Sequence, residues 1–198
     1  MGARRGHPIP TAAGSPWAVH QFFGRSPAPE RFSTGRGMGP PSTNPLRSNL
    51  VTKRARQRVL VVCTGNSARS IMAEALFQAL GQGAVEVVSA GSAPTGRVNP
   101  LALEQISRLP VDPGQFTSKS LAAVLEASAD PFDLAITVCD HAARHCDPLP
   151  ADATRLHWGL PDPAAHTELK EARTAFSACF DLLAERIGDL LDAELPQA

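Results

Sequence analysis

The sequence contains no tyrosine, and its 198 residues include only eight phenylalanines and two tryptophans. So few aromatic rings argue against a binding cleft walled by aromatic side chains. No apolar run approaches the roughly 20 residues that span a membrane, and the amino terminus lacks the apolar core of a secretory signal. These absences argue against a membrane or secreted protein and lead us to expect a cytoplasmic one.

Acidic residues are almost missing from the first part of the chain. Residues 1–58 hold ten lysines and arginines and one acid, Glu30, whereas residues 59–198 hold nine basic and eighteen acidic residues. The formal net charge of zero therefore conceals +9 before residue 59 and −9 after it. Residues 1–57 are also rich in proline, glycine, serine and arginine, and have too few apolar residues to offset the entropy of ordering. We predict a disordered basic tail over 1–57 and a folded domain over 58–198.

The role of this tail stays open between several alternatives. A sequence rich in arginine and serine and poor in acids is typical of an organellar transit peptide, and also of a basic arm that binds nucleic acid. Dense proline and glycine argue against the amphipathic helix of a transit peptide. We favour a translation start near Met38 or Val51, or a dispensable tail.

After the tail, apolar strands alternate with helices, a pattern typical of a doubly wound parallel sheet. The predicted strands span 58–62, 85–89, 134–138 and 154–157, and the predicted helices span 69–80, 99–108, 121–127 and 168–191. In the last helix, residues at helical spacing form an apolar stripe that faces the core, namely Phe176, Cys179, Phe180, Leu183, Ile187 and Leu190. We predict an α/β, flavodoxin-like fold with a four-stranded parallel sheet and helices on both faces.

The most informative run is CTGNSARS at residues 63–70, directly after an apolar stretch. It places Cys63 at the end of a strand and Arg69 at the start of a helix, with small residues between them that let the backbone N–H groups form a nest for an anion. Arg69 can direct two donors onto a phosphate-like oxyanion and stabilise the thiolate of Cys63. A buried, inert cysteine would need neither the glycine nor the arginine. We predict a nucleophile, Cys63, in an oxyanion cradle of Thr64, Gly65, Asn66, Ser67, Ala68 and Arg69.

The run CTGNSARSIMAE, from Cys63 to Glu74, resembles the low-molecular-weight protein tyrosine phosphatase superfamily, and most closely its arsenate reductase branch. Three further motifs follow in the family's order: SAG at 89–91, TVCD at 137–140 and HWGLPDPA at 157–164. The resemblance extends from the first predicted strand to the last helix. It implies a catalytic domain that attacks arsenate or phosphate-like oxyanions through a cysteine.

Two further cysteines have a spacing that matters. Cys146 follows Cys139 by seven positions, and in a regular helix the two would lie about 10 Å apart, beyond the about 7 Å between Cα atoms that a disulfide allows. They can therefore join only if the segment unwinds or was never a full helix. In the arsenate reductases that this chain resembles, the corresponding cysteines form a relay, which implies that Cys63 takes arsenate, Cys139 attacks the adduct and Cys146 resolves the disulfide. The resemblance also implies an external reductant, thioredoxin or glutathione with glutaredoxin, and no bound cofactor.

Other roles compete for the cysteines. The segment 139–146 contains cysteine, aspartate and histidine, which can bind zinc, but their spacing fits no common zinc pattern. Cys139 can also be a buried residue at the end of a strand, and Cys146 an idle surface thiol. We assign Cys179 to the apolar core, because its helical stripe is apolar and it lies far along the chain from the other motifs.

Asp162 is the candidate general acid. Transfer of an oxyanion to a thiolate needs a proton for the departing oxygen, and Asp162 lies between two prolines that fix a loop. The residues alone fit a turn-forming aspartate equally well, whereas the family pattern at 157–164 implies the acid. Ser70 is a candidate to donate its hydroxyl to Cys63, and otherwise an ordinary serine of the first helical turn. Asn66 braces the loop or tolerates its turn geometry.

Two departures from the family pattern affect the predicted site. Ala68 stands where some reductases have a second cysteine, which excludes an extra thiol in the loop. Certain relatives hold a monovalent cation with Asn, Glu, Ser and Asp side chains, and Asn66, Glu74 and Ser89 match the first three. Lys119 aligns with the aspartate, and its ammonium can replace the charge of the cation. We therefore predict no metal.

A phosphatase acting on phosphotyrosine or small phosphate esters is the main alternative, because it would use the same thiolate, arginine and acid. Cys139 and Cys146 favour reduction, which needs electrons from thiols, over hydrolysis, which needs only water. A non-catalytic oxyanion sensor whose basic tail binds nucleic acid would leave the acid and the cysteine pair unexplained. We predict an arsenate reductase for arsenic detoxification, without a membrane or nucleic-acid partner.

Overall fold

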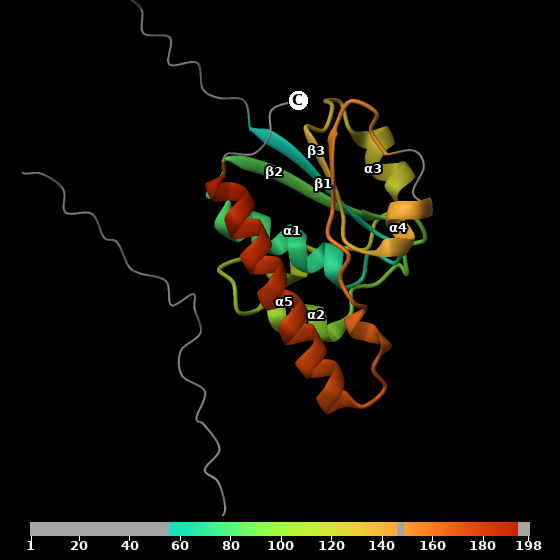
Figure 1. Ribbon diagram of the computed structural model, residues 1–198, viewed down its shortest axis with the longest axis vertical. Helices are drawn as coiled ribbons and strands as arrows, with labels where there is room; N and C mark the ends of the chain where they lie inside the picture. The colour runs from blue at the N-terminus through green and yellow to red at the C-terminus, as the bar shows by residue number, and fades with distance from the viewer. Residues whose placement is uncertain (1–55, 146–148, 194–198) are drawn as a thin grey trace, which may run out of the picture. The chain divides into compact units, whose positions relative to one another are not determined.

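Four parallel strands form a single sheet in the order β2-β1-β3-β4 (Figure 1). The computed structural model describes residues 56–145 and 149–193, so all but the last two residues of the predicted tail lie outside the described residues. The strands are β1 (Gln57–Cys63), β2 (Val85–Gly91), β3 (Leu134–Thr137) and β4 (Thr154–His157). The predicted four-stranded parallel sheet is confirmed, with boundaries that agree to within two residues.

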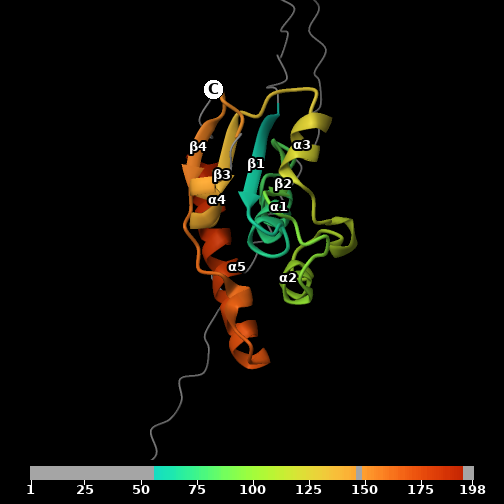
Figure 2. The ribbon, with the colours of Figure 1, turned by 90° about the vertical axis from the view of Figure 1, so that its right-hand side faces the viewer.

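The described helices cover both faces of the sheet. They are α1 (Arg69–Leu80), α2 (Pro100–Ile106), α3 (Leu121–Ala127), α4 (Asp140–His145) and α5 (Leu169–Asp192), with short 3-10 helices η1 (Pro113–Gln115) and η2 (Pro163–Ala165). Figure 2 looks onto the face that α3 and α4 cover, with α1 and α5 behind the sheet. The sequence did not predict α4, because its six residues, DHAARH, are too few to form an apolar stripe.

The central strand β1 brings the candidate nucleophile to the edge of the sheet. Its residues Val59, Leu60, Val61 and Val62 are all fully buried, as expected for a parallel strand with helices on both sides. The strand pairs with β2 on one side and β3 on the other, and Cys63 at its end lies opposite Gly91. The next strand of the chain, β2, lies on one side of β1, and β3 lies on the other side. The strand order thus reverses at β1, and such a switch point is where doubly wound sheets bind ligands.

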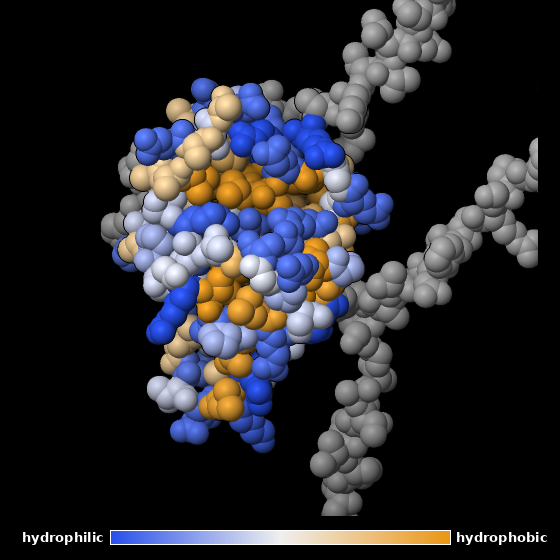
Figure 3. All heavy atoms as spheres, turned by 180° about the vertical axis from the view of Figure 1, so that it is seen from behind, coloured by the Kyte–Doolittle hydropathy of each residue, from blue (hydrophilic) through white to orange (hydrophobic). Residues whose placement is uncertain are grey.

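Helix α5 closes the core over α1 and α2, which it contacts along its length. Five residues of the predicted stripe are buried and Leu190 is half-buried. Seen from behind, apolar residues gather in separate patches with hydrophilic residues between them (Figure 3). In the described part of the chain, Leu80 and Leu169 are the large apolar residues that are exposed. Within residues 56–145 and 149–193, no helix is both long and apolar enough to cross a membrane.

Candidate active site

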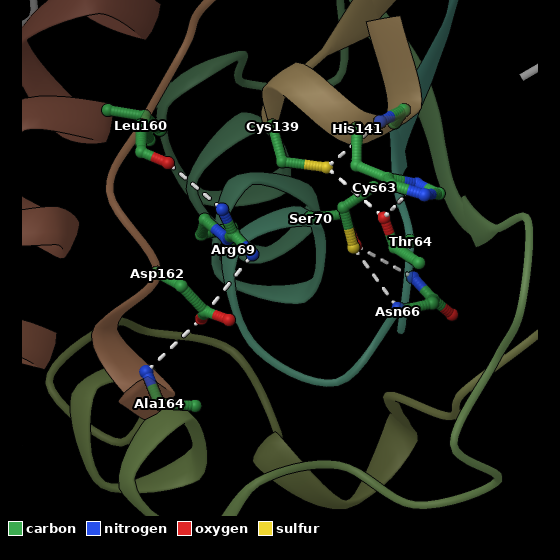
Figure 4. A network of polar contacts seen from close by, with 11 residues as sticks. Cys63, Thr64, Asn66, Arg69, Ser70, Cys139, His141, Leu160, Asp162 and Ala164 are labelled. Atoms are coloured by element: carbon green, nitrogen blue, oxygen red, sulfur yellow. Dashed lines mark hydrogen bonds and ion pairs between the residues drawn. The ribbon is translucent and has the colours of Figure 1, made fainter. Parts of the chain in front are cut away.

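The sulfur of Cys63 lies at the carboxyl end of β1, and the residue is only 3% exposed. Its Sγ accepts a hydrogen bond from the N–H of Asn66 at 3.1 Å and lies 2.9 Å from Oγ of Ser70 in the first turn of α1 (Figure 4). Asn66 has a φ of 42°, in the left-handed region that asparagine tolerates better than most residues, and this conformation folds the loop back over the sulfur. Two polar groups therefore converge on one sulfur, which suits a thiolate.

A buried chain of polar contacts allows the Ser70 hydroxyl to donate its proton to Cys63. Oδ1 of Asn66 accepts the N–H of Lys119 at 2.6 Å, so its Nδ2 is the donor to Oγ of Ser70 at 2.9 Å and to Oγ of Ser89 at 2.8 Å. Since Oγ of Ser70 accepts from Asn66, its own proton can point to Cys63. Ser70 and Asn66 thus both contact the Cys63 sulfur.

The same chain of contacts continues to a partly buried ion pair. Oγ of Ser89 donates to Glu74 Oε2 at 2.5 Å, and the Lys119 ammonium lies 3.2 and 3.3 Å from the two carboxylate oxygens of Glu74. Glu74 is 6% exposed, and a carboxylate buried this deeply needs a charged partner. No group of three or more His, Cys, Asp or Glu residues in the described part of the chain could hold a metal ion. Lys119 supplies the positive charge beside Glu74.

The backbone of the loop at 64–68 has the orientation of an anion cradle. Carbonyl groups of residues 63–67 accept four hydrogen bonds, of 2.8 to 3.2 Å, from the backbone of residues 92–99. A trans peptide points its N–H opposite to its C=O, so the N–H groups that follow these carbonyls point away from that segment. The N–H of Asn66 does so when it donates to the sulfur. The N–H groups concerned belong to Thr64, Gly65, Asn66 and Ala68.

Gly91 allows β2 to pass close to this loop. A Cβ built there would lie 2.6 Å from the carbonyl oxygen of Thr64 and 2.9 Å from Cβ of Asn66. We expect Gly91→Ala to lower the free energy of unfolding by about 1–3 kcal/mol, because overpacking forces backbone shifts. Urea denaturation measures the loss. In the control Gly188→Ala, the new Cβ meets nothing within 4 Å, and helix propensity should raise stability by about 0.5–1 kcal/mol; equal stability of the two variants would contradict the prediction.

Arg69 spans the cleft from α1 to the loop after β4. Its Nη1 donates to the carbonyl of Leu160 at 2.9 Å, and its Nη2 lies 3.3 Å from Oδ1 of Asp162 (Figure 4). Oδ1 of Asp162 also accepts the N–H of Ala164 at 3.2 Å and so caps η2. The same carboxylate therefore holds a turn and faces Arg69, so the two roles that the sequence left open for Asp162 are compatible.

A cavity of about 720 Å³ connects these groups. Cys63, Arg69, Cys139 and Asp162 line it, together with most of the cradle. None of the described residues that line it is a phenylalanine, tyrosine or tryptophan. The cavity thus has the polar groups to hold an oxyanion and no aromatic wall for a tyrosyl ring.

Cys139 opens onto the same cavity as Cys63. It lies between β3 and α4 and is 4% exposed. Its Sγ accepts the N–H of Ala142 at 3.4 Å and lies 3.5 Å from Oγ1 of Thr64. The structure thus brings together the two thiols predicted for the first redox step, whereas Cys146, the predicted resolving thiol, lies outside the described residues.

Cys179 is buried in α5, as expected for a residue of the apolar core. Its distance along the chain from the other motifs, however, does not separate it from them in space. The sequence placed it far from the other motifs, whereas Cys179 and Asp162 line a common cavity of about 200 Å³. Burial raises the pKa of its thiol to about 11, the charge of Arg69 lowers it, and the charge of Asp162 raises it. Because burial has the largest effect, the Cys179 thiol stays protonated and unreactive near neutral pH.

His141 also lines the cavity, although the sequence analysis did not predict it as a residue of the active site. Its Nδ1 lies 3.3 Å from Oγ1 of Thr64, and the neighbouring Asp140 lies 3.1 Å from Nε2 of His157. The sequence analysis treated His141 only as a potential zinc ligand. A histidine two positions after a candidate redox cysteine is the signal that would have identified it.

Comparison with known proteins finds relatives over most of the chain. A family model described as low molecular weight phosphotyrosine protein phosphatase matches residues 58–198. An arsenate reductase of Bacillus cereus is 38% identical over 109 residues, which cover 55% of this chain and 78% of that protein. Arsenate reductase 1 of Staphylococcus epidermidis is 33% identical over 135 residues, which cover 67% of this chain and 98% of that protein.

A solved structure has the same fold. The crystal structure of an arsenate reductase from Archaeoglobus fulgidus superposes with a TM-score of 0.52 at 30% sequence identity. The match covers 68% of this chain and 98% of that one. The similarity therefore spans nearly the whole of that relative.

Proposed function

The chain belongs to the low molecular weight phosphotyrosine protein phosphatase family, and on that premise we propose that it is an arsenate reductase that forms arsenite for arsenic detoxification. The observation that carries this proposal is the second thiol: Cys139 lines the cavity that holds Cys63. Hydrolysis of a phosphocysteine needs only water, whereas reduction of As(V) to As(III) takes two electrons, which two thiols supply when they form a disulfide. The arsenate reductases among its relatives support the same choice.

In the first step, the Cys63 thiolate attacks the arsenic atom of arsenate. The loop N–H groups and Arg69 bind the remaining oxygens, where negative charge concentrates. Asp162 lines the same cavity, and in its protonated form its carboxyl gives a proton to the departing oxygen, which leaves as water. The product is an arsenate ester of Cys63.

In the second step, Cys139 attacks the sulfur of Cys63. The sulfur–arsenic bond breaks, its electron pair stays on arsenic, and arsenite leaves as the two sulfurs become a disulfide. Cys146 then attacks Cys139 and releases Cys63. Seven positions of helix would separate Cys139 and Cys146 by about 10 Å, so this step requires α4 (Asp140–His145) to unwind. An external thiol system, thioredoxin or glutaredoxin with glutathione, completes the cycle.

A phosphatase is the second candidate, because the Arg69–Asp162 pair and the cradle serve a phosphate ester equally well. The step after adduct formation distinguishes the two reactions, since water completes hydrolysis and Cys139 completes reduction. The lack of aromatic residues among the described residues that line the cavity disfavours a tyrosyl substrate.

The deciding experiment supplies arsenate to the purified chain with thioredoxin, thioredoxin reductase and NADPH, and measures both NADPH oxidation and arsenite. We expect one arsenite per NADPH consumed, and loss of turnover in Cys146→Ser. Turnover that survives in Cys146→Ser would remove Cys146 from the relay and keep the reductase. No arsenite with thioredoxin, or with glutathione and glutaredoxin, together with hydrolysis of p-nitrophenyl phosphate, would overturn the proposal in favour of the phosphatase.

A further inference from the structure

We propose that His141 is the base that takes the proton of Cys139, through the hydroxyl of Thr64, when Cys139 becomes a nucleophile. This inference rests on the proposed function, because only a reductase needs a thiolate at Cys139. His141 acts through Thr64 and is therefore a positioning residue for the second redox step.

The contacts place the Thr64 hydroxyl between the thiol and the imidazole. Its Oγ1 lies 3.5 Å from Sγ of Cys139 and 3.3 Å from Nδ1 of His141 (Figure 4). A hydroxyl has one proton to donate and two lone pairs, so it can accept the thiol proton while it donates its own to the ring. The ring then starts with its proton on Nε2 and ends as imidazolium. Thr64 thus belongs to both the oxyanion cradle and this relay.

The other charged groups of the cavity are directed elsewhere. Asp162 pairs with Arg69 at 3.3 Å, and Asp140 pairs with His157 at 3.1 Å. Among the side chains of the same helix that the structure describes, that of Arg144 is also charged, but it is exposed and does not line the cavity. Near neutral pH a thiol is mostly protonated, and imidazole is the common side-chain base in that range. The imidazole of His141, which adjoins the Thr64 hydroxyl, is therefore suited to take the proton of that hydroxyl.

The electron and proton balance of the step is complete. Sγ of Cys139 gives its proton to Oγ1 of Thr64, which gives its own to Nδ1 of His141. The Cys139 thiolate then forms the bond to Sγ of Cys63 while the sulfur–arsenic bond breaks toward arsenic. Both sulfurs are oxidised and arsenic is reduced. The N–H of Ala142, 3.4 Å from Sγ, stabilises the thiolate before it attacks.

Alkylation of Cys139 tests the relay without arsenate. Iodoacetamide reacts with thiolates, and peptide mass spectrometry assigns the rate to each cysteine across the pH range. We expect His141→Asn, which retains a polar atom near Nδ1 but does not titrate, to slow Cys139 alkylation about fivefold near pH 7, with the difference disappearing above about pH 9. Thr64→Val should have the same effect, and the double variant no larger one. Arg144→Gln, which removes an exposed charge from the same helix, should match the wild type.

Two outcomes would overturn the relay. One is a Cys139 alkylation profile in His141→Asn that is identical to that of the wild type. The other is a changed profile in His141→Asn together with an unchanged one in Thr64→Val, because the proton would then bypass the hydroxyl.

In single turnover, arsenite release in His141→Asn should be roughly tenfold or more slower near pH 7. A chain that forms no arsenite yet has the histidine-dependent alkylation profile would overturn the proposed function and support the relay.

Discussion

Cys139→Ser is expected to lower arsenate reduction by about a thousandfold or more while p-nitrophenyl phosphate hydrolysis continues. A serine hydroxyl cannot form a disulfide with Cys63, so the arsenate ester of Cys63 has no route to arsenite. The hydrolytic reaction needs the loop N–H groups, Arg69 and Asp162, and a serine hydroxyl at position 139 can still contact the side chain of Thr64. Arsenite assay and phosphate-ester hydrolysis on the same preparation measure the two activities.

Two further cysteine variants make this result specific. Cys63→Ser should lose both activities, because each begins with attack by its sulfur. Cys179→Ala should keep both, because burial raises the pKa of that thiol to about 11 and leaves it protonated. Arsenite formation by Cys139→Ser at the rate of Cys179→Ala would contradict the assignment of Cys139 as the attacking thiol.

The sequence predicted the fold well, because the decisive signals are local. The predicted helices at 69–80 and 121–127 and the strand at 154–157 have the bounds of α1, α3 and β4. The predicted helix at 99–108 begins one residue early, because Asn99 is its cap and accepts the N–H of Leu101 at 2.9 Å. A cap residue lies outside the helix although its sequence signal marks the start.

Contacts between distant segments were harder to predict. Nothing local in the sequence shows that α5 brings Cys179 close enough for the charges of Arg69 and Asp162 to act on its thiol. Likewise, α4 is too short to have a periodic pattern, and its position against β1 and β3 decides that His141 meets Thr64. The cradle was predictable because its cysteine, small residues and arginine lie within one octapeptide. The sequence thus grouped the residues of the predicted cradle, and the tertiary structure was needed to find the contacts of the thiols.

Lys119→Met is expected to lower the free energy of unfolding by about 2–3 kcal/mol, because it leaves the Glu74 carboxylate buried without a counter-charge. This loss of stability is smaller than for a fully buried ion pair, because the Lys119 side chain is 27% exposed and solvent screens its charge. Activity should fall as well, since Glu74 holds Ser89, Ser89 accepts from Asn66, and Asn66 orients the hydroxyl that faces Cys63. Urea denaturation and steady-state kinetics measure the two effects.

Two variants separate the charge of Lys119 from its packing. Glu74→Gln combined with Lys119→Met should recover most of the lost stability, because a carboxamide still accepts from Ser89 and needs no counter-charge. Lys119→Asp should be less stable than Lys119→Met in choline chloride and should gain stability in KCl, because a second carboxylate beside Glu74 favours a bound monovalent cation. The wild type should respond equally to the two salts, since its ammonium already lies 3.2 Å from that carboxylate. A Lys119→Asp protein with the same stability in both salts would show that a bound cation cannot replace the ammonium beside Glu74. The match of Asn66 and Ser89 to cation ligands would then reflect only their contacts within the protein.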